Sequence, residues 1–150
     1  MKFISWNIRG QNGAHKQEIV RNMISDQRPN FLLIQETKMK KDMVGKLSLS
    51  SSIYGEAIDS EGVVSDLLMF FNNKAFKIST IYNEGNALLC NVFHIHSRDS
   101  WFLLNVYAPN SKRERRDFWD KILCLIQSSN LKKGIIMGDF NTPLSDEEKS

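Results

Sequence analysis

The chain has 150 residues, of which 41% are hydrophobic and 25% are charged, a composition typical of one soluble globular domain rather than of a disordered or membrane-spanning chain. Its 20 basic and 17 acidic side chains permit a nucleic-acid partner without indicating one. No apolar run is long enough to span a bilayer, and Asn7 and Arg9 interrupt the N-terminal apolar stretch too early for a signal peptide. We therefore expect an intracellular protein, either nuclear or cytoplasmic.

The hydrophobic pattern predicts two helices among a larger number of strands. A β-rich run at Lys2–Ile8 precedes a helix at His15–Gln27, an apolar strand at Phe31–Ile34 and a basic segment at Lys38–Leu47, predicted as a loop or short helix. Five β-like stretches follow, at Ile53–Ile58, Leu67–Phe71, Phe76–Tyr82, Leu88–His96 and Trp101–Tyr107, and then an amphipathic helix at Arg113–Gln127 and a last strand at Gly134–Met137. This order predicts a mixed sheet system with helices on its outer faces.

Four of the predicted strands end in polar side chains, which is where open α/β sheets commonly place their chemistry. These are Asn7 and Glu36 after the first two strands, Tyr107 and Asn110 after a later strand, and Asp139 and Asn141 after the last.

The chemistry of these groups suits a phosphate ester. Glu36 can hold Mg²⁺, which prefers oxygen ligands and usually takes only one or two carboxylates. Asp139 can orient or deprotonate a water nucleophile. The three asparagines and the Tyr107 hydroxyl are neutral donors, suited to phosphate oxygens or to a developing negative charge.

Each of these residues also has a simpler explanation. Acids at strand ends are often merely solvated, and asparagines often form turns by bonding to their own backbone. Tyr107 can be a core aromatic whose hydroxyl reaches solvent.

The two cysteines, Cys90 and Cys124, lie in apolar segments without metal or redox spacing, so we expect buried free thiols.

Taken together, the four segments resemble the endonuclease/exonuclease/phosphatase superfamily, and in particular the apurinic-endonuclease-like domain of plant non-LTR (LINE-type) retrotransposons. The matching motifs are Trp6-Asn7-Ile8-Arg9-Gly10, Gln35-Glu36-Thr37-Lys38, Tyr107-Ala108-Pro109-Asn110 and Gly138-Asp139-Phe140-Asn141. They occur in the same order as in the family, and the resemblance extends from Lys2 to Leu144.

The resemblance implies an α/β four-layer sandwich, with two mixed sheets face to face and helices outside, and hydrolysis of a phosphodiester or phosphomonoester with Mg²⁺ (Mn²⁺ as an alternative ion). It implies that Glu36 is the metal ligand with Asn7 close beside it, and that Asp139 handles the attacking water. Asn141, Asn110 and Tyr107 would contact the scissile phosphate. The implied substrate is DNA, although phosphoinositide phosphatases, sphingomyelinases and deadenylases share the fold.

The family's closing motifs, an Asp-x-Trp-Arg-like segment and a terminal Ser-Asp-His, have no counterpart in this sequence. The resemblance therefore implies that residues 1–150 are the N-terminal part of a domain of about 250 residues, with an unpaired edge strand or exposed apolar surface. It leaves two hypotheses for this chain. The first is a Mg²⁺-dependent endonuclease. The second is a catalytically inactive remnant of a retroelement, either with or without the ability to bind nucleic acid.

Two further groups of residues lie outside the motifs. None of His15, His94 and His96 replaces the missing histidine; His94 and His96 are expected on one solvated face of a strand. Two basic clusters, each following a motif segment, are either solvated surface or contacts for a phosphate backbone. The first comprises Lys38, Lys40, Lys41 and Lys46, and the second comprises Lys112, Arg113, Arg115 and Arg116.

Overall fold

The computed structural model describes residues 1–9, 13–40, 56–59 and 64–142. Among these residues, eight strands and two helices occur in the order β1 (Phe3–Asn7), α1 (Gly13–Gln27), β2 (Phe31–Lys40), β3 (Glu56–Asp59), β4 (Val64–Phe71), β5 (Phe76–Glu84), β6 (Ala87–His94), β7 (Asp99–Tyr107), α3 (Lys112–Ser128) and β8 (Gly134–Asp139). Within this part of the chain, no helix combines the length and the apolarity that crossing a bilayer requires.

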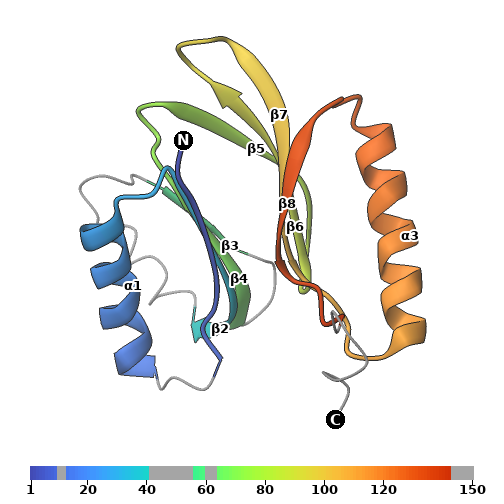
Figure 1. Cartoon of the computed structure of the whole chain (residues 1–150), viewed down its shortest axis with the longest axis horizontal. Helices are drawn as coiled ribbons and strands as arrows, with labels where there is room; N and C mark the ends of the chain where they lie inside the picture. The colour runs from blue at the N-terminus through green and yellow to red at the C-terminus, as the bar shows by residue number, and fades with distance from the viewer. Residues whose placement is uncertain (10–12, 41–55, 60–63, 143–150) are drawn as a thin grey trace.

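The strands form two four-stranded mixed sheets, with the orders β1-β2-β4-β3 and β5-β6-β7-β8. Strands β1 and β2 are parallel, as are β7 and β8, while the other neighbours are antiparallel. The sheets face each other, with α1 outside the first and α3 outside the second (Figure 1). The expected four-layer α/β sandwich is confirmed.

Alternation along the strands explains the layers, because successive side chains point to opposite faces of a sheet. In β2, Phe31 and Leu33 lie in the cluster between the sheets, whereas Leu32 and Ile34 pack towards Val20 and Ile24 of α1. The second sheet divides in the same way. Leu103 faces the first sheet, and Leu104 and Val106 pack with Phe118 and Ile122 of α3. Strands apolar on both faces are thus explained by burial on both sides.

Helix α3 begins with a reciprocal cap. The Ser111 hydroxyl accepts a hydrogen bond from the Glu114 backbone N–H at 3.2 Å and donates one to the Glu114 carboxylate at 2.9 Å. Such a cap satisfies an otherwise unpaired helix donor. It fixes the start of α3 directly after the Tyr107–Asn110 segment.

The boundaries differ from the predicted ones where a regular pattern is broken. Strand β2 does not end at Ile34 but continues to Lys40 through a bulge, and pairing resumes at Met39 with Ser65. Glu36 and Lys38 have positive φ angles of 54° and 47° in this bulge, which interrupts the alternation that identifies a strand. Residues 41–55, which include the rest of the predicted basic segment and the start of the predicted Ile53–Ile58 strand, lie outside the described residues.

Two side chains lie elsewhere than the sequence predicts. Strand β6 ends at His94, so His96 lies in the β6–β7 turn rather than on a strand face with His94. Cys90 is buried as expected, and burial raises the pKa of its thiol to about 12. Cys124 is instead exposed, because it lies on the solvent side of α3.

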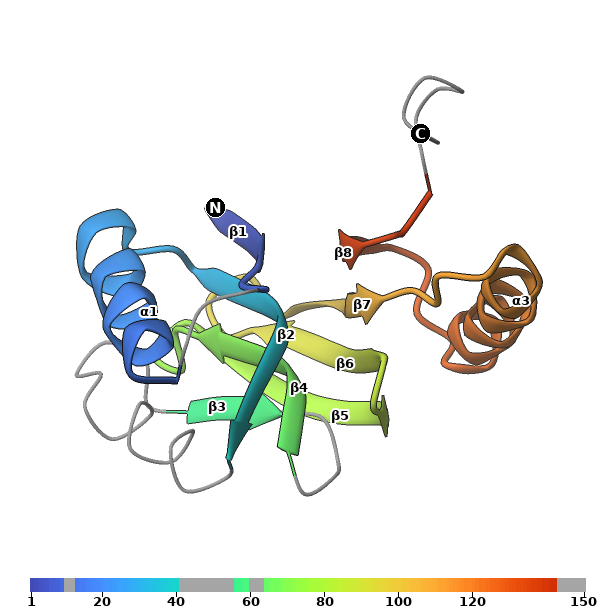
Figure 2. The ribbon, with the colours of Figure 1, turned by 90° about the horizontal axis from the view of Figure 1, so that it is seen from below.

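One side of the sandwich is an edge in both sheets. Strands β1 and β8 lie side by side there (Figure 2), and each pairs with only one of the described strands. Ile136 and Phe140 remain 38% and 42% exposed. Strands β1 and β8 are thus edge strands among the described residues, and the missing C-terminal portion expected from the sequence stays a prediction.

A buried polar connection joins the two sheets near the carboxyl ends of β1 and β7. Gln35 of β2 donates from Nε2 to Asn105 Oδ1 of β7 at 2.7 Å and to Ser5 Oγ at 3.1 Å. Asn105 Nδ2 donates across the interface to the carbonyl oxygens of Ile34 (3.2 Å) and Leu68 (3.0 Å). Because these amides are paired in an otherwise apolar interface, they fix one alignment of the sheets.

We predict that Gly138→Ala destabilises the fold by about 2–4 kcal/mol. Gly138 has φ +139°, and an added Cβ would lie 2.0 Å from the Val106 backbone oxygen. The measurement is urea unfolding, with Gly85→Ala as the control, since a Cβ at Gly85 meets nothing within 4 Å. Equal midpoints for the two variants would contradict this account.

We also predict that Asn105→Leu lowers the free energy of unfolding by about 1–3 kcal/mol, because buried partners lose a hydrogen bond. The double variant Gln35→Leu/Asn105→Leu should lose less than the sum of the single variants, since neither amide is then left unpaired. A double-mutant cycle measured by denaturant unfolding checks this. Strict additivity would show that the pair does not act as a unit.

Candidate functional site

The candidate site lies where the carboxyl ends of the two parallel strand pairs meet. In the first sheet Asn7 pairs with Gln35, so Asn7 and Glu36 end β1 and the regular part of β2 side by side. In the second sheet Tyr107 is aligned with Asp139. Parallel pairing places the carboxyl ends of both paired strands at the same end of each sheet. Because the two sheets face each other, these two ends lie close together.

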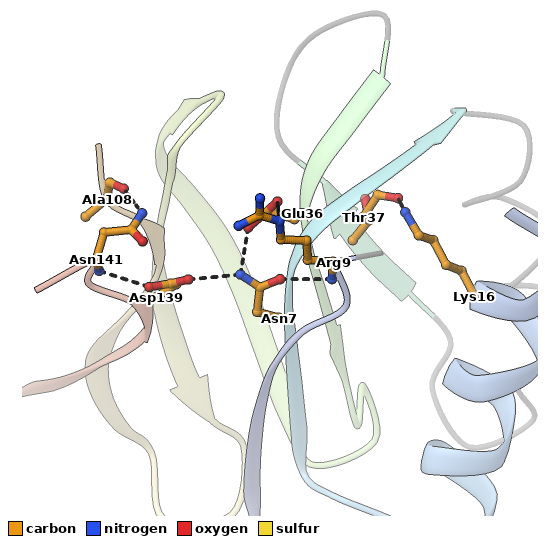
Figure 3. A network of polar contacts seen from close by, with 8 residues as sticks. All are labelled: Asn7, Arg9, Lys16, Glu36, Thr37, Ala108, Asp139 and Asn141. Atoms are coloured by element: carbon orange, nitrogen blue, oxygen red, sulfur yellow. Dashed lines mark hydrogen bonds and ion pairs between the residues drawn. The ribbon is translucent and has the colours of Figure 1, made fainter. Parts of the chain in front are cut away.

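Asn7 connects the two acidic groups of the site. Its Nδ2 donates to Glu36 Oε1 at 2.8 Å and to Asp139 Oδ2 at 2.9 Å (Figure 3). Its Oδ1 accepts from the Arg9 backbone N–H at 2.9 Å. Both Nδ2 protons are therefore used, and the amide can neither rotate nor move without breaking a contact to one of the sheets.

The second amide, Asn141, fixes Asp139 from the other side. The Asn141 backbone N–H donates to Asp139 Oδ1 at 2.9 Å, and its Nδ2 donates to the carbonyl oxygen of Ala108. The Ala108 N–H in turn donates to the Asp139 carbonyl oxygen at 2.8 Å. Asn141 has φ 48°, a left-handed conformation that asparagine tolerates better than most residues. Each Asp139 carboxylate oxygen thus has its own donor.

Tyr107 links the same groups. Burial and, next, a hydrogen bond to the Glu36 carboxylate raise the pKa of the Tyr107 hydroxyl above its ordinary value of 10.0, as do the negative charges of Glu36 and Asp139. A hydrogen bond from Asn141 acts in the opposite direction. The balance keeps Tyr107 protonated, and therefore a donor, at neutral pH.

Glu36 is held in place by a residue that the sequence did not single out. Lys16 of α1 is buried and donates from Nζ to the Thr37 carbonyl oxygen at 2.8 Å (Figure 3). This bond supports the bulge in which Glu36 has a positive φ, a conformation that costs free energy in a non-glycine residue. The Glu36 side chain is 10% exposed, and the Arg9 guanidinium, 80% exposed, lies 4.0 Å from its Oε2.

An open cleft of about 830 Å³ lies over these groups. Of the six residues predicted from the sequence, Asn7, Asn110, Asp139 and Asn141 line it, while Glu36 and Tyr107 contact those residues without being part of the lining. Lys112 and Arg115 of the second basic cluster also line the cleft. Lys38 of the first cluster is not among its lining residues.

The structure adds residues that the motif reasoning missed. Gln35 belongs to the second motif, which predicts no role for it, and it lines the cleft while donating to Asn105. Asn105 itself carried a readable signal, since it is the one amide on the Leu103–Asn105–Tyr107 face of a strand that is otherwise apolar towards the core. Lys16 carried none, because a lysine in an amphipathic helix is ordinarily solvated.

The donor set bears on the metal expected from the sequence. In the described part of the chain, no three His, Cys, Asp or Glu side chains converge on one point. Only two carboxylates of this part of the chain converge, those of Glu36 and Asp139. This number suits Mg²⁺, which usually binds one or two carboxylates in proteins and keeps water molecules as its other ligands. The residues present therefore fit Mg²⁺ better than an ion that needs several side-chain ligands, such as a structural zinc.

Solved structures share this fold at low sequence identity. An endonuclease/exonuclease/phosphatase from Bacteroides vulgatus aligns with a TM-score of 0.77 at 16% identity, covering 99% of this chain and 69% of that one. D. rerio TDP2 complexed with single strand DNA product aligns with a TM-score of 0.70 at 16% identity, covering 95% and 61%. The endonuclease domain of TRAS1, a telomere-specific non-LTR retrotransposon, aligns with a TM-score of 0.67 at 12% identity, covering 95% and 61%.

The last two alignments span about three-fifths of the related chains. The model of the Endonuclease/Exonuclease/phosphatase family, in contrast, matches residues 4–150, which include all four motif segments. The chain belongs to the endonuclease/exonuclease/phosphatase family.

Proposed function

We propose that this chain carries the metal-binding and water-activating part of a divalent-metal-dependent phosphodiesterase site that acts on DNA. The observation that carries the proposal is the convergence of the Glu36 and Asp139 carboxylates, from different sheets, on the Asn7 amide. The TRAS1 endonuclease and the DNA-bound TDP2 share the fold, which supports DNA as the substrate.

Each residue has a distinct role in this proposal. Glu36 holds Mg²⁺ or Mn²⁺, and the chemistry that the bound ion supplies is neutralisation of negative charge on the phosphate. Asp139, with both oxygens held by donors, orients the attacking water and accepts its proton.

The neutral donors complete the site. Asn110, which lines the cleft, donates to phosphate oxygens, on which charge increases as the water attacks. Tyr107 and Asn141 take part by exchanging their present hydrogen bonds, to Glu36 and to Ala108, for bonds to the phosphate. Asn7 is assigned to orienting the two carboxylates, because both its Nδ2 protons are already donated to them. The phosphate contact expected for Asn7 from the sequence stays a prediction.

Nicking of supercoiled plasmid in Mg²⁺ tests the proposal. Asp139→Asn, which keeps the shape of the side chain but removes the base, should lower the rate by about 10²–10⁴-fold. Asp120→Asn is the matched control, since Asp120 is exposed on α3 and should leave the rate unchanged. Equal nicking by the parent chain and Asp139→Asn, or nicking that persists in EDTA, would reject it.

A second candidate function is nucleic-acid binding without hydrolysis. It is favoured by Lys112 and Arg115, which line the same cleft as the carboxylates. DNA binding by the parent chain without any Mg²⁺-dependent nicking would select this alternative.

Calorimetric titration with Mn²⁺ gives an independent measure of the metal site, and Glu36→Gln should weaken the binding of Mn²⁺ at least tenfold.

The pKa of Tyr107 provides a test that does not depend on turnover. We expect the absorbance difference at 295 nm between the chain and Tyr107→Phe to titrate above pH 10, because burial and Glu36 favour the protonated phenol. Glu36→Gln should move this titration back towards the ordinary value. Since the folded-state pKa exceeds the unfolded one, Tyr107 leaves stability unchanged below about pH 10 and lowers it as the pH rises further. A titration at or below the ordinary value would contradict the described contacts.

A further inference from the structure

One wall of the cleft is built from groups that the proposed chemistry does not use. It consists of Phe140, directly after Asp139, and of Lys112 and Arg115 in the first turn of α3. We call these three residues the cationic-aromatic wall. Phe140 is 42% exposed although its neighbours in sequence are the functional Asp139 and Asn141.

The Phe140 ring is fixed from behind. Its centroid lies 5.5 Å from that of Trp119 at an interplanar angle of 68°, and Trp119 lies 5.1 Å from the buried Phe118 at 73°. These edge-to-face contacts are the favourable arrangement of aromatic pairs. They hold Phe140 by one side against α3 while it lines the cleft. The ring is thus held in a defined orientation and is still accessible to a ligand.

The positive charges of Lys112 and Arg115 lie beside the cleft and are not balanced by an acidic partner among the described residues. Arg115 Nη1 donates to the backbone oxygens of Pro109 (3.3 Å) and Asn110, which position the guanidinium beside the cleft without cancelling its charge. Lys112 is exposed at the cleft. Among the described residues, neither side chain is in an ion pair.

We propose that the cationic-aromatic wall is a nucleotide subsite beside the phosphate site. Phe140 stacks on the base of an unpaired nucleotide, and Lys112 and Arg115 bind the phosphate that follows it. A paired base exposes only its edges, so a stacking ring selects single-stranded or locally opened DNA. This inference rests on the proposed function and narrows its substrate class.

Binding in EDTA, where no metal-dependent hydrolysis occurs, tests the subsite directly. Fluorescence anisotropy compares a labelled single-stranded oligodeoxynucleotide with one of equal length made only of abasic sites. Phe140→Leu should bind the normal oligonucleotide about tenfold more weakly than the parent chain, and the abasic one equally well. Phe140→Trp restores a stacking face and should restore the affinity.

The cations give a second, separable readout. Lys112→Gln should weaken binding of both oligonucleotides and reduce the slope of log affinity against log salt by about 0.7, the value for one phosphate contact on a single strand. Lys132→Gln is the matched control, because Lys132 is exposed just before β8, at the end opposite Asp139, and should change neither quantity.

The outcomes separate this inference from the proposed function. Equal losses on normal and abasic strands in Phe140→Leu, or no loss on either, would overturn base stacking, and plasmid nicking by the parent chain would then leave the proposed function standing. A loss confined to the normal strand, reversed by Phe140→Trp, supports the subsite even if the plasmid is never nicked. Failure of Phe140→Trp to bind better than Phe140→Leu would also reject it.

Discussion

Two carboxylates from different sheets share one amide, and the rest of the site depends on that contact. Unit charges of the same sign about 4 Å apart repel by about 4 kcal/mol at the effective dielectric of a protein surface, so Glu36 and Asp139 need donors placed between and around them. Asn7 supplies two hydrogen bonds, and Asn141 and Tyr107 supply others. Small shifts between the sheets would break this set, which explains why a buried amide pair, Gln35 and Asn105, joins the sheets nearby.

Backbone strain at the site is offset by specific contacts. Glu36 and Asn141 both have positive φ angles, and residues in such conformations persist only where the surroundings determine them. For Glu36 the support is Lys16, which binds the next carbonyl oxygen, and for Asn141 it is the pair of bonds to Asp139 and Ala108. Both strained residues are thus held by hydrogen bonds at the site or directly beside it.

Much of this arrangement could be predicted from local sequence, and the remainder depends on contacts between distant segments. Apolar runs identified the strands, and the polar residues after them identified Asn7, Glu36, Tyr107, Asn110, Asp139 and Asn141. The bulge after Gln35 was not predicted, because it arises where β2 resumes pairing with β4 at Met39. The role of Lys16 depends on how α1 packs on the first sheet, and the exposure of Cys124 on which face of α3 meets the second. The bulge, the role of Lys16 and the exposure of Cys124 all depend on contacts between segments that are distant in the sequence, so a short stretch of sequence does not reveal them.

The charges of the cleft give an independent reason for the proposed divalent ion. A phosphodiester carries a negative charge, and it would approach Glu36 and Asp139, which carry two more. The nearest cation described beside them, Arg9, lies 4.0 Å from Glu36 and is 80% exposed, so solvent screens most of its effect. Lys112 and Arg115 line the cleft, but Arg115 is anchored to the Pro109–Asn110 backbone rather than to either carboxylate. In the proposed function these cations would attract the DNA backbone without cancelling the repulsion at the reacting phosphate. A divalent ion held by Glu36 would remove that repulsion where it is largest. By occupying the carboxylate it would also release the Tyr107 hydroxyl, which is now bonded to Glu36, to donate to the phosphate together with Asn110.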